Sequence, residues 1–333
     1  MPAISLEQLV AQGLSNSSAV TIGNYDGFHL GHQALLTELR RLAQKHAAVA
    51  TTLSFDPHPA QFFRPQEPFA RLLSAAQRQR GFLELGVEQP VTLKFDATIS
   101  KLSAEEFFEK VLRQALRAKA IVVGHDFCFG AGRHGDVKLL GDLCAPHDIE
   151  LMVIGSQRDT NGQLSSTRVR RLLQNDGDVA TAAQLLGRPF LLEGVIAPGQ
   201  QLGRKIGFPT LNLRMLDQMT PRYGVYAGHV WMAPANEPEL APTIMRLPSA
   251  ARTAVFNIGV RPTVNETERK THIEAHILDW PASFEPPANR RVGFYLVQRL
   301  RDEMKFAGLE ELKTQIANDV VSAREIFADE VPR

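Results

Sequence analysis

The pattern of apolar segments changes near residue 187, and this change constrains the fold more than any other feature of the chain. Before it, short apolar runs alternate with amphipathic stretches, as in a parallel sheet covered by helices. We expect strands at residues 19–23, 49–55, 91–95, 120–124 and 149–155. After it, β-rich runs follow one another without intervening helices, which predicts an antiparallel sheet or small barrel. The sequence therefore predicts an α/β domain at residues 1–186 and a β domain at 187–333.

Helix signals frame these two regions. Ser103 and Glu106 form a capping box that predicts a helix start. Two further helices are expected at residues 167–174 and 178–186, and the β-rich runs lie at 224–230, 253–258, 271–278 and 291–297. A final helix is predicted from apolar residues at helical spacing, which we expect to pack on the barrel as core: Leu309, Leu312, Ile316, Val320, Ala323 and Phe327.

Bulk composition limits the partners. At 333 residues the chain exceeds one ordinary core, so two domains are expected. It has no apolar tract of about 18 residues or more and no secretory signal pattern, so we expect a cytoplasmic protein without a membrane partner. Its net charge of +1 gives no field that gathers nucleic acid. The two cysteines favour free thiols over a disulfide. Small phosphorylated molecules are the expected partners, and a weak homo-oligomer is compatible with the sequence.

A glycine-rich segment joins the first expected strand to an amphipathic helix. It carries two histidines that would lie together at the helix N-terminus, His29 and His32. The N–H groups that open a helix bind anions, and imidazoles there can donate hydrogen bonds to phosphate oxygens in a transition state. Taken alone, a glycine-rich turn with a surface histidine is commonplace. The other candidate ligand contacts in this segment are Gly23, Asn24, Asp26 and Gly31.

Polar residues also follow other expected strands of the first domain. His58 follows the second strand and Asp126 the fourth. Residues just past the carboxyl ends of parallel strands converge on one crevice, so we expect both near the histidines. After the fifth strand, hydroxyls and a cation open another helix, where they can bind and neutralise phosphate. Alone this run is only a helix cap, but with the histidines it predicts a triphosphate clamp. Its residues are Ser165, Ser166, Thr167 and Arg168.

The second half carries a glycine loop that leads into Thr210 and Asn212. Alternation along a strand would aim both side chains to one side. Hydroxyl and amide oxygens are hard ligands that suit Mg²⁺. Threonine and asparagine beside proline are also ordinary turn residues, so this motif alone leaves that interpretation open. The loop adds three candidate ligand contacts, which are Gly203, Lys205 and Gly207.

Glu274 is the candidate general base. It alternates with Ile273 and Ala275, which places it on the opposite face of an expected strand. A kinase that acts on an alcohol benefits from a carboxylate that accepts the hydroxyl proton. The alternative is a solvated glutamate on the barrel exterior, and spacing does not separate the two interpretations.

These motifs resemble a known family. Residues 23–32 and 165–168 are similar to the signatures of the HxGH nucleotidyltransferases, and residues 56–59, 124–130, 203–212, 257–263 and 274–279 extend the resemblance to prokaryotic bifunctional riboflavin kinase/FMN adenylyltransferases. The resemblance covers almost the whole chain. It implies a Rossmann-like domain followed by a six-stranded antiparallel β-barrel with a C-terminal helix. Arg324 in that helix also fits the family pattern.

The resemblance further implies the chemistry. ATP, riboflavin and FMN are the implied substrates and Mg²⁺ the implied cofactor, held by Thr210 and Asn212. His29, His32 and Arg168 would stabilise the phosphates during adenylyl transfer to FMN, which needs no general base because the attacking phosphate is already anionic. Glu274 would be the general base that accepts the hydroxyl proton when riboflavin is phosphorylated.

Three departures from the family pattern stand out. Cys128 replaces the usual arginine, the segment after Trp280 differs, and the loop at residues 233–251 is long. Two alternatives therefore stay open. One is an FMN adenylyltransferase whose second domain is a degraded flavin-binding module, and the other is a nucleotide-binding protein that is not an enzyme.

Overall fold

The computed structural model describes residues 3–160, 162–198, 203, 206–215, 217–261, 270–281, 285 and 287–328. It divides into two compact units, Met1–Ser166 and Thr167–Arg333. The segment at residues 167–186, which we expected at the end of the first domain, is thus grouped with the barrel. The limits of the two functional domains stay a prediction.

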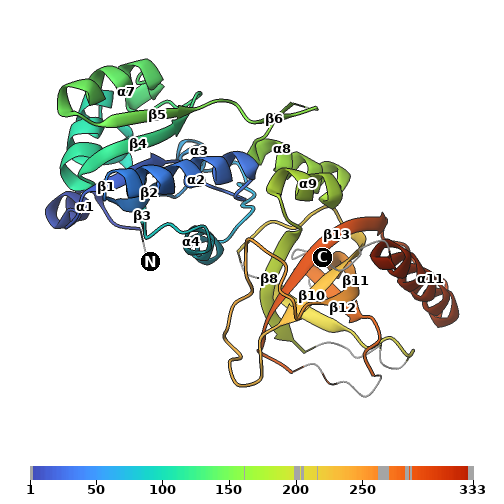
Figure 1. Cartoon of the computed structure of the whole chain (residues 1–333). Coiled ribbons are helices and arrows are strands. Elements are labelled where there is room, and N and C mark those ends of the chain that lie inside the picture. Colours follow the sequence, from blue (N-terminus) through green and yellow to red (C-terminus); the bar gives the residue numbers. More distant parts are fainter. Residues whose placement is uncertain are drawn as a thin grey trace. The chain divides into compact units, whose positions relative to one another are not determined.

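The first unit is built on a five-stranded parallel sheet of order β3-β2-β1-β4-β5 (Figure 1). Each strand lies within two residues of its expected position. The strand order reverses between β1 and β4, and in such sheets this reversal marks the ligand crevice. The strands are β1 (Ser18–Ile22), β2 (Val49–Asp56), β3 (Gln89–Lys94), β4 (Ala118–Gly124) and β5 (Glu150–Ile154).

Helices cover this sheet. The central helix α2 packs on β1, β2 and β4 and buries Leu36, Leu39 and Leu42, whose spacing places them on one face. The predicted capping box of Ser103 and Glu106 is confirmed at the start of α6. The helices are α1 (Leu6–Gln12), α2 (Leu30–Lys45), α3 (Pro59–Phe63), α4 (Ala75–Glu84), α5 (Ala97–Ser100), α6 (Ala104–Phe107) with its π-helical continuation η1 (Phe108–Ala115), and α7 (Val137–Cys144).

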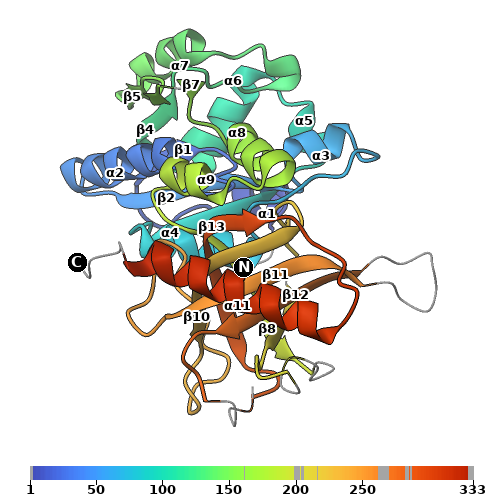
Figure 2. The ribbon, with the colours of Figure 1, turned by 90° about the vertical axis from the view of Figure 1, so that its right-hand side faces the viewer.

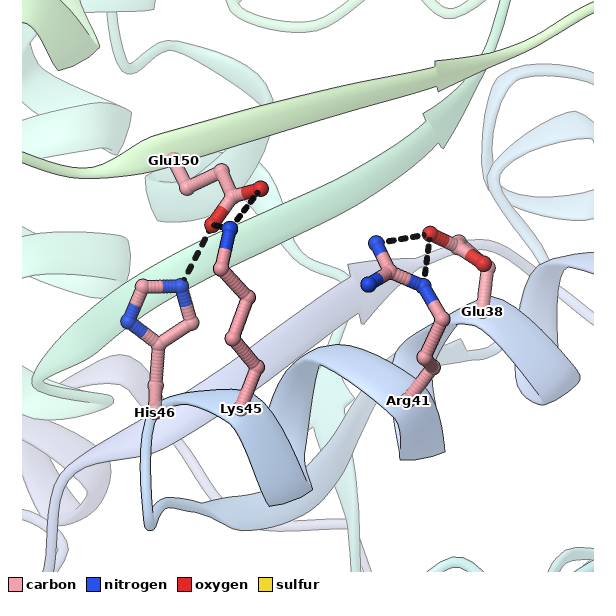
Figure 3. Close-up of polar contacts among 5 residues, drawn as sticks. All are labelled: Glu38, Arg41, Lys45, His46 and Glu150. Carbon is pink, nitrogen blue, oxygen red and sulfur yellow. Dashed lines mark hydrogen bonds and ion pairs between the residues drawn. The ribbon is translucent and has the colours of Figure 1, made fainter.

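Charged side chains tie the end of α2 to β5 (Figure 3). Lys45 Nζ and His46 Nε2 lie 2.7 and 2.6 Å from Oε2 of Glu150. These contacts lower the pKa of Glu150, with the Lys45 hydrogen bond as the largest cause. The pair Glu38 and Arg41 lies one turn further back on the same helix.

The second unit is a closed barrel of order β10-β11-β12-β9-β8-β13, and every pairing in it is antiparallel. The expected six-stranded barrel is therefore confirmed. The helical elements α8 (Ser166–Arg171), η4 (Leu172–Asp176) and α9 (Val179–Leu186) precede it. Its strands are β8 (Phe190–Ala197), β9 (Leu211–Met215), β10 (Gly224–Met232), β11 (Arg252–Arg261), β12 (Lys270–Ile277) and β13 (Arg291–Arg301).

The final helix α11 (Leu309–Ala328) runs across the barrel (Figure 2) and packs on β10, β11 and β13. Its apolar stripe is core only in its second half, where Ala323 is fully buried and Val320 packs beside it. Leu309 is 53% exposed, and Leu312 and Ile316 line a cavity instead. The expectation that the whole stripe is core is thus wrong, because the helix leaves the barrel surface open beneath its first turns.

Several smaller features complete the fold. The loop at residues 233–251 is anchored by Arg188 and Tyr295, whose side chains donate to the carbonyl oxygens of Ile244 and Thr243, so the barrel closes despite the longer loop. A two-stranded ladder, β6 (Arg158–Asp159) with β7 (Gly162–Gln163), was not expected. Both cysteines are free thiols. Among the described helices, none combines the length and apolarity that crossing a bilayer requires.

Candidate active sites

A cavity of about 820 Å³ opens at the carboxyl ends of the parallel strands in the first unit. Four predicted site residues line it, which are Gly23, Asn24, His58 and Asp126. Its walls are aromatic, with Phe55, Phe63, Phe95, Phe127 and Phe129. Phenylalanine faces suit a flat heterocycle, and arginine side chains at the rim suit its phosphate. The rim arginines are Arg64 and Arg133, and Cys128 also lines the cavity.

The two predicted histidines lie face to face at the start of α2. The rings of His29 and His32 stack with centroids 3.7 Å apart. His29 caps the helix, because its Nδ1 accepts a hydrogen bond from the backbone N–H of His32 at 3.3 Å. That contact places the proton of a neutral His29 ring on Nε2. Gly31 leaves room for this arrangement, since a Cβ would lie 3.1 Å from the His29 ring and the ring would have to shift.

A buried tyrosine, which sequence reasoning missed, supports this pair. Tyr25 lies 5.1 Å from the ring of His32, and its hydroxyl is 2.6 Å from that of Thr21. Burial raises the pKa of Tyr25 well above its usual value, and the hydrogen bond with Thr21 acts in the opposite direction. The positive φ of Tyr25 (51°) is the local turn that brings the ring under His32, and no residue type in the sequence signalled it.

Asp26 supports the loop rather than facing the cavity. Its carboxylate is buried and accepts hydrogen bonds from the backbone N–H groups of Leu72 and Leu73, each at 3.0 Å. Its carbonyl oxygen accepts a hydrogen bond from Ser166 Oγ at 2.6 Å. The structure therefore joins the histidine motif to the Ser165–Ser166 segment through the backbone.

The remaining members of the predicted clamp follow directly. Thr167 and Arg168 lie in the first turn of α8, which opens the second unit.

A buried cation within the first unit was not predicted from the sequence. Arg78 is 8% exposed, and its guanidinium donates to the carbonyl oxygen of Asn24 at 3.4 Å. Burial lowers the pKa of Arg78, and the nearby Asp56 and Asp26 oppose that shift.

A second cavity, of about 200 Å³, lies between the barrel and α11. The predicted residues Gly203, Thr210 and Glu274 line it, together with Asn257 and His276. Ile273 and Ala275 are fully buried in the barrel, so Glu274 lies on the opposite face of the strand, as predicted, and there it lines the cavity. His276 donates from Nδ1 to the carbonyl oxygen of Pro209 at 2.9 Å, and burial lowers its pKa.

The predicted metal ligands flank this cavity. Asn212 pairs with Glu274 across β9 and β12, so both side chains lie on the same face of the sheet. Asn212 is 8% exposed, and its Oδ1 is buried without a hydrogen-bond partner in the described part of the chain. A buried oxygen of this kind needs a partner. Together with the Thr210 hydroxyl it fits a hard cation, and no cluster of His, Cys, Asp or Glu among the described residues offers another site.

The far wall of the second cavity was not predicted. Arg301 binds the carboxylate of Asp319 in α11 through two contacts of 2.8 and 2.7 Å. Glu303 and Phe306 complete this wall. Nothing in the local sequence pairs Asp319 with an arginine in β13.

Two predicted ligand contacts do not line the second cavity. Arg324 is in an exposed ion pair with Asp279 at 2.5 Å. Gly207, at φ +90°, is a turn residue between Ile206 and Phe208, which do line the cavity. Lys205 falls outside the described residues.

The parallel sheet with its histidine motif defines a nucleotidyltransferase unit. The closed barrel with its carboxylate, which follows it in the chain, defines a kinase-type barrel. The FAD synthetase family matches residues 12–168, and the riboflavin kinase family matches residues 186–327. The chain belongs to the family of bifunctional riboflavin kinase/FMN adenylyltransferases.

Several relatives span nearly the whole chain. The bifunctional riboflavin kinase/FMN adenylyltransferase of Escherichia coli K12 is 36% identical over 318 residues, which cover 96% of this chain and 95% of that protein. The protein of the same name from Pseudomonas fluorescens is 36% identical and covers 94% of each chain. A crystal structure of a protein from Streptococcus pneumoniae, described as a macrolide-efflux protein, has the same fold, with a TM-score of 0.82, 27% identity and coverage of 97% and 99%.

Proposed function

We propose that this chain converts riboflavin to FMN in its barrel domain and FMN to FAD in its nucleotidyltransferase domain, using ATP in both steps. The observation that carries the proposal is the presence of one lined cavity in each unit, each within the range of a different family. We place the functional boundary at residues 186 and 187, where the riboflavin kinase family begins to match.

In the adenylyl step, a phosphate oxygen of FMN attacks the α-phosphorus of ATP and pyrophosphate leaves. The attacking oxygen is already anionic, so the protein contributes position and charge rather than a base. His29 and His32 donate hydrogen bonds to the reacting phosphoryl group. Ser165, Thr167 and Arg168 hold the pyrophosphate. The flavin ring lies on the phenylalanine walls, near Asp126.

In the kinase step, the terminal hydroxyl of riboflavin attacks the γ-phosphorus of ATP, the bond to the bridging oxygen breaks, and ADP leaves. Glu274 accepts the hydroxyl proton. Thr210 and Asn212 would hold Mg²⁺, which would supply positive charge that neutralises the phosphates. Gly203 and Phe208 line the cavity on the same side, where the ATP phosphates would enter.

We further propose that the protein works in the cytoplasm on small molecules, without nucleic acid or membrane partners, and forms at most a weak homo-oligomer. A net charge of +1 supports the absence of a nucleic-acid partner, because it provides no attraction for polyanions. Size-exclusion chromatography with light scattering, across protein concentrations, tests the oligomeric state.

A flavin time course tests the main proposal. The purified chain is given riboflavin, ATP and Mg²⁺, and riboflavin, FMN and FAD are separated at intervals. FMN should form first and FAD after it. FAD from added FMN, without FMN from riboflavin, would instead support the adenylyltransferase with a degraded second domain. Nucleotide binding without formation of FMN, FAD or pyrophosphate would contradict both enzymatic hypotheses.

A further inference from the structure

One histidine beside the second cavity has no part in the mechanism so far. His272 lies two residues before Glu274 on β12, and alternation puts both side chains on the same face of the strand. Its Nε2 lies 2.6 Å from Oε1 of Glu274, an ion-pair contact with both side chains about one-fifth exposed (19% and 23%). His272 Nε2 is buried and forms no aligned hydrogen bond in the described part of the chain, so its contact with the carboxylate rests on proximity.

A second carboxylate, that of Glu303, lies near this imidazole. His272 pairs with Gly259 across β11 and β12. Gly259 has no side chain, and a Cβ there would lie 1.8 Å from Oε1 of Glu303, so the Glu303 carboxylate rests directly on the β11 backbone opposite His272. Burial raises the pKa of Glu303, while the charges of Arg301 and His272 act in the opposite direction.

The neighbouring histidine is engaged differently. His276 lies two residues after Glu274 and is bound to the carbonyl oxygen of Pro209. It cannot hold the glutamate at the same time through that nitrogen. Glu274, Glu303 and His276 line the cavity, whereas His272 is not among the described lining residues. His272 therefore contacts the base without facing the substrate.

We propose that His272 is a positioning residue for riboflavin phosphorylation, which holds the Glu274 carboxylate in place and links it to Glu303. This inference rests on the proposed role of Glu274 as the base. A carboxylate held by an imidazole on one oxygen loses rotational freedom, so it meets the substrate hydroxyl in fewer orientations. Removal of the contact should slow the chemical step more than it weakens riboflavin binding.

The test compares His272→Ala, His272→Gln, Glu274→Gln and the double variant His272→Ala/Glu274→Gln in the full chain. We expect His272→Ala to lower kcat for FMN formation about tenfold with KM for riboflavin changed less than about twofold. His272→Gln keeps a side chain of similar size with an N–H donor, and should recover part of the rate. In the double variant the loss should not exceed that of Glu274→Gln, because the two residues act as one unit.

Controls separate folding from positioning. Thr271→Ala removes an exposed side chain of the same strand and should leave kcat unchanged. Melting curves of each variant, and FAD formation from FMN in the same preparations, report whether the two units are intact. Unchanged kcat in both His272 variants, with activity lost in Glu274→Gln, would overturn the inference alone. Full kinase activity in Glu274→Gln would overturn the base assignment and the inference together.

Discussion

Ser166 Oγ donates a hydrogen bond of 2.6 Å to the carbonyl oxygen of Asp26, 140 residues earlier in the chain. This bond joins the loop that carries the paired histidines to the segment that opens α8. The carboxylate of Asp26 is meanwhile held by the backbone of Leu72 and Leu73. Two separate chain segments are thus fixed to one loop, which keeps His29 and His32 in a set position.

Ser166→Ala removes this bond. A net hydrogen bond is worth about 1 kcal/mol, so we expect adenylyl transfer to slow about fivefold if the loop position matters. FMN formation should not change. Thr37→Ala is the matched control, because it removes a hydroxyl–carbonyl bond on the exposed face of α2. Equal rates of FAD formation in wild type and Ser166→Ala would contradict a role for this bond.

Gly81 allows α4 to approach the histidine loop. A Cβ at Gly81 would lie 2.3 Å from the ring of Phe28, so Gly81→Ala should lower the free energy of unfolding of the first unit by about 1–3 kcal/mol through overpacking. Gly155→Ala is the control, since a Cβ there meets nothing within 4 Å. Urea unfolding of both variants measures the difference, and similar stabilities would show that Phe28 can move aside freely.

Asn212→Ala tests the metal site. Loss of the buried Oδ1 should raise the Mg²⁺ concentration needed for half-maximal FMN formation by about tenfold. The Mg²⁺ dependence of FAD formation from FMN, measured on the same preparation, should stay the same, because that step uses the other unit. Chelation of Mg²⁺ should stop FMN formation altogether. An unchanged Mg²⁺ titration in Asn212→Ala would remove this residue from the metal site.

The contact of Glu150 with Lys45 and His46 should depend on pH. These partners lower the pKa of Glu150 from 4.5, so in this range the unfolded chain binds the proton more readily than the folded one. The stabilisation is therefore complete above pH 4.5 and is lost as pH falls through the lower pKa of the folded state. Glu150→Gln should shift the urea midpoint at pH 7 more than at pH 4. The difference should shrink in 1 M NaCl, and its persistence there would argue against an ion pair.

Local sequence signals predicted the elements well. The strands of the sheet and the capping box at Ser103 depend on neighbours within a few residues, which a sequence displays directly. The histidine pair was also predictable, because a strand, a glycine-rich turn and a helix start lie within 11 residues, from 22 to 32. The same holds for Glu274, whose face follows from alternation with Ile273 and Ala275.

Contacts between distant segments could not be predicted. The position of Glu303 over Gly259, and the pair of Arg301 with Asp319, arise only when the barrel closes and α11 crosses it. Leu312 and Ile316 were expected to be core, since helical spacing alone does not show where a helix leaves the surface that it covers. The sequence likewise did not show that the carboxylate of Asp26 accepts hydrogen bonds from the backbone of the loop that precedes α4.

Separate sites for the two activities are tested most directly by one pair of variants assayed for both products. We predict that His29→Ala lowers FAD formation from FMN by about 10²–10³-fold and leaves FMN formation from riboflavin within about twofold of wild type. Glu274→Gln should do the reverse, with a loss of about 10²–10⁴-fold in FMN formation and normal FAD formation from FMN. Loss of both activities to the same extent in either variant, with the protein folded, would contradict two independent sites.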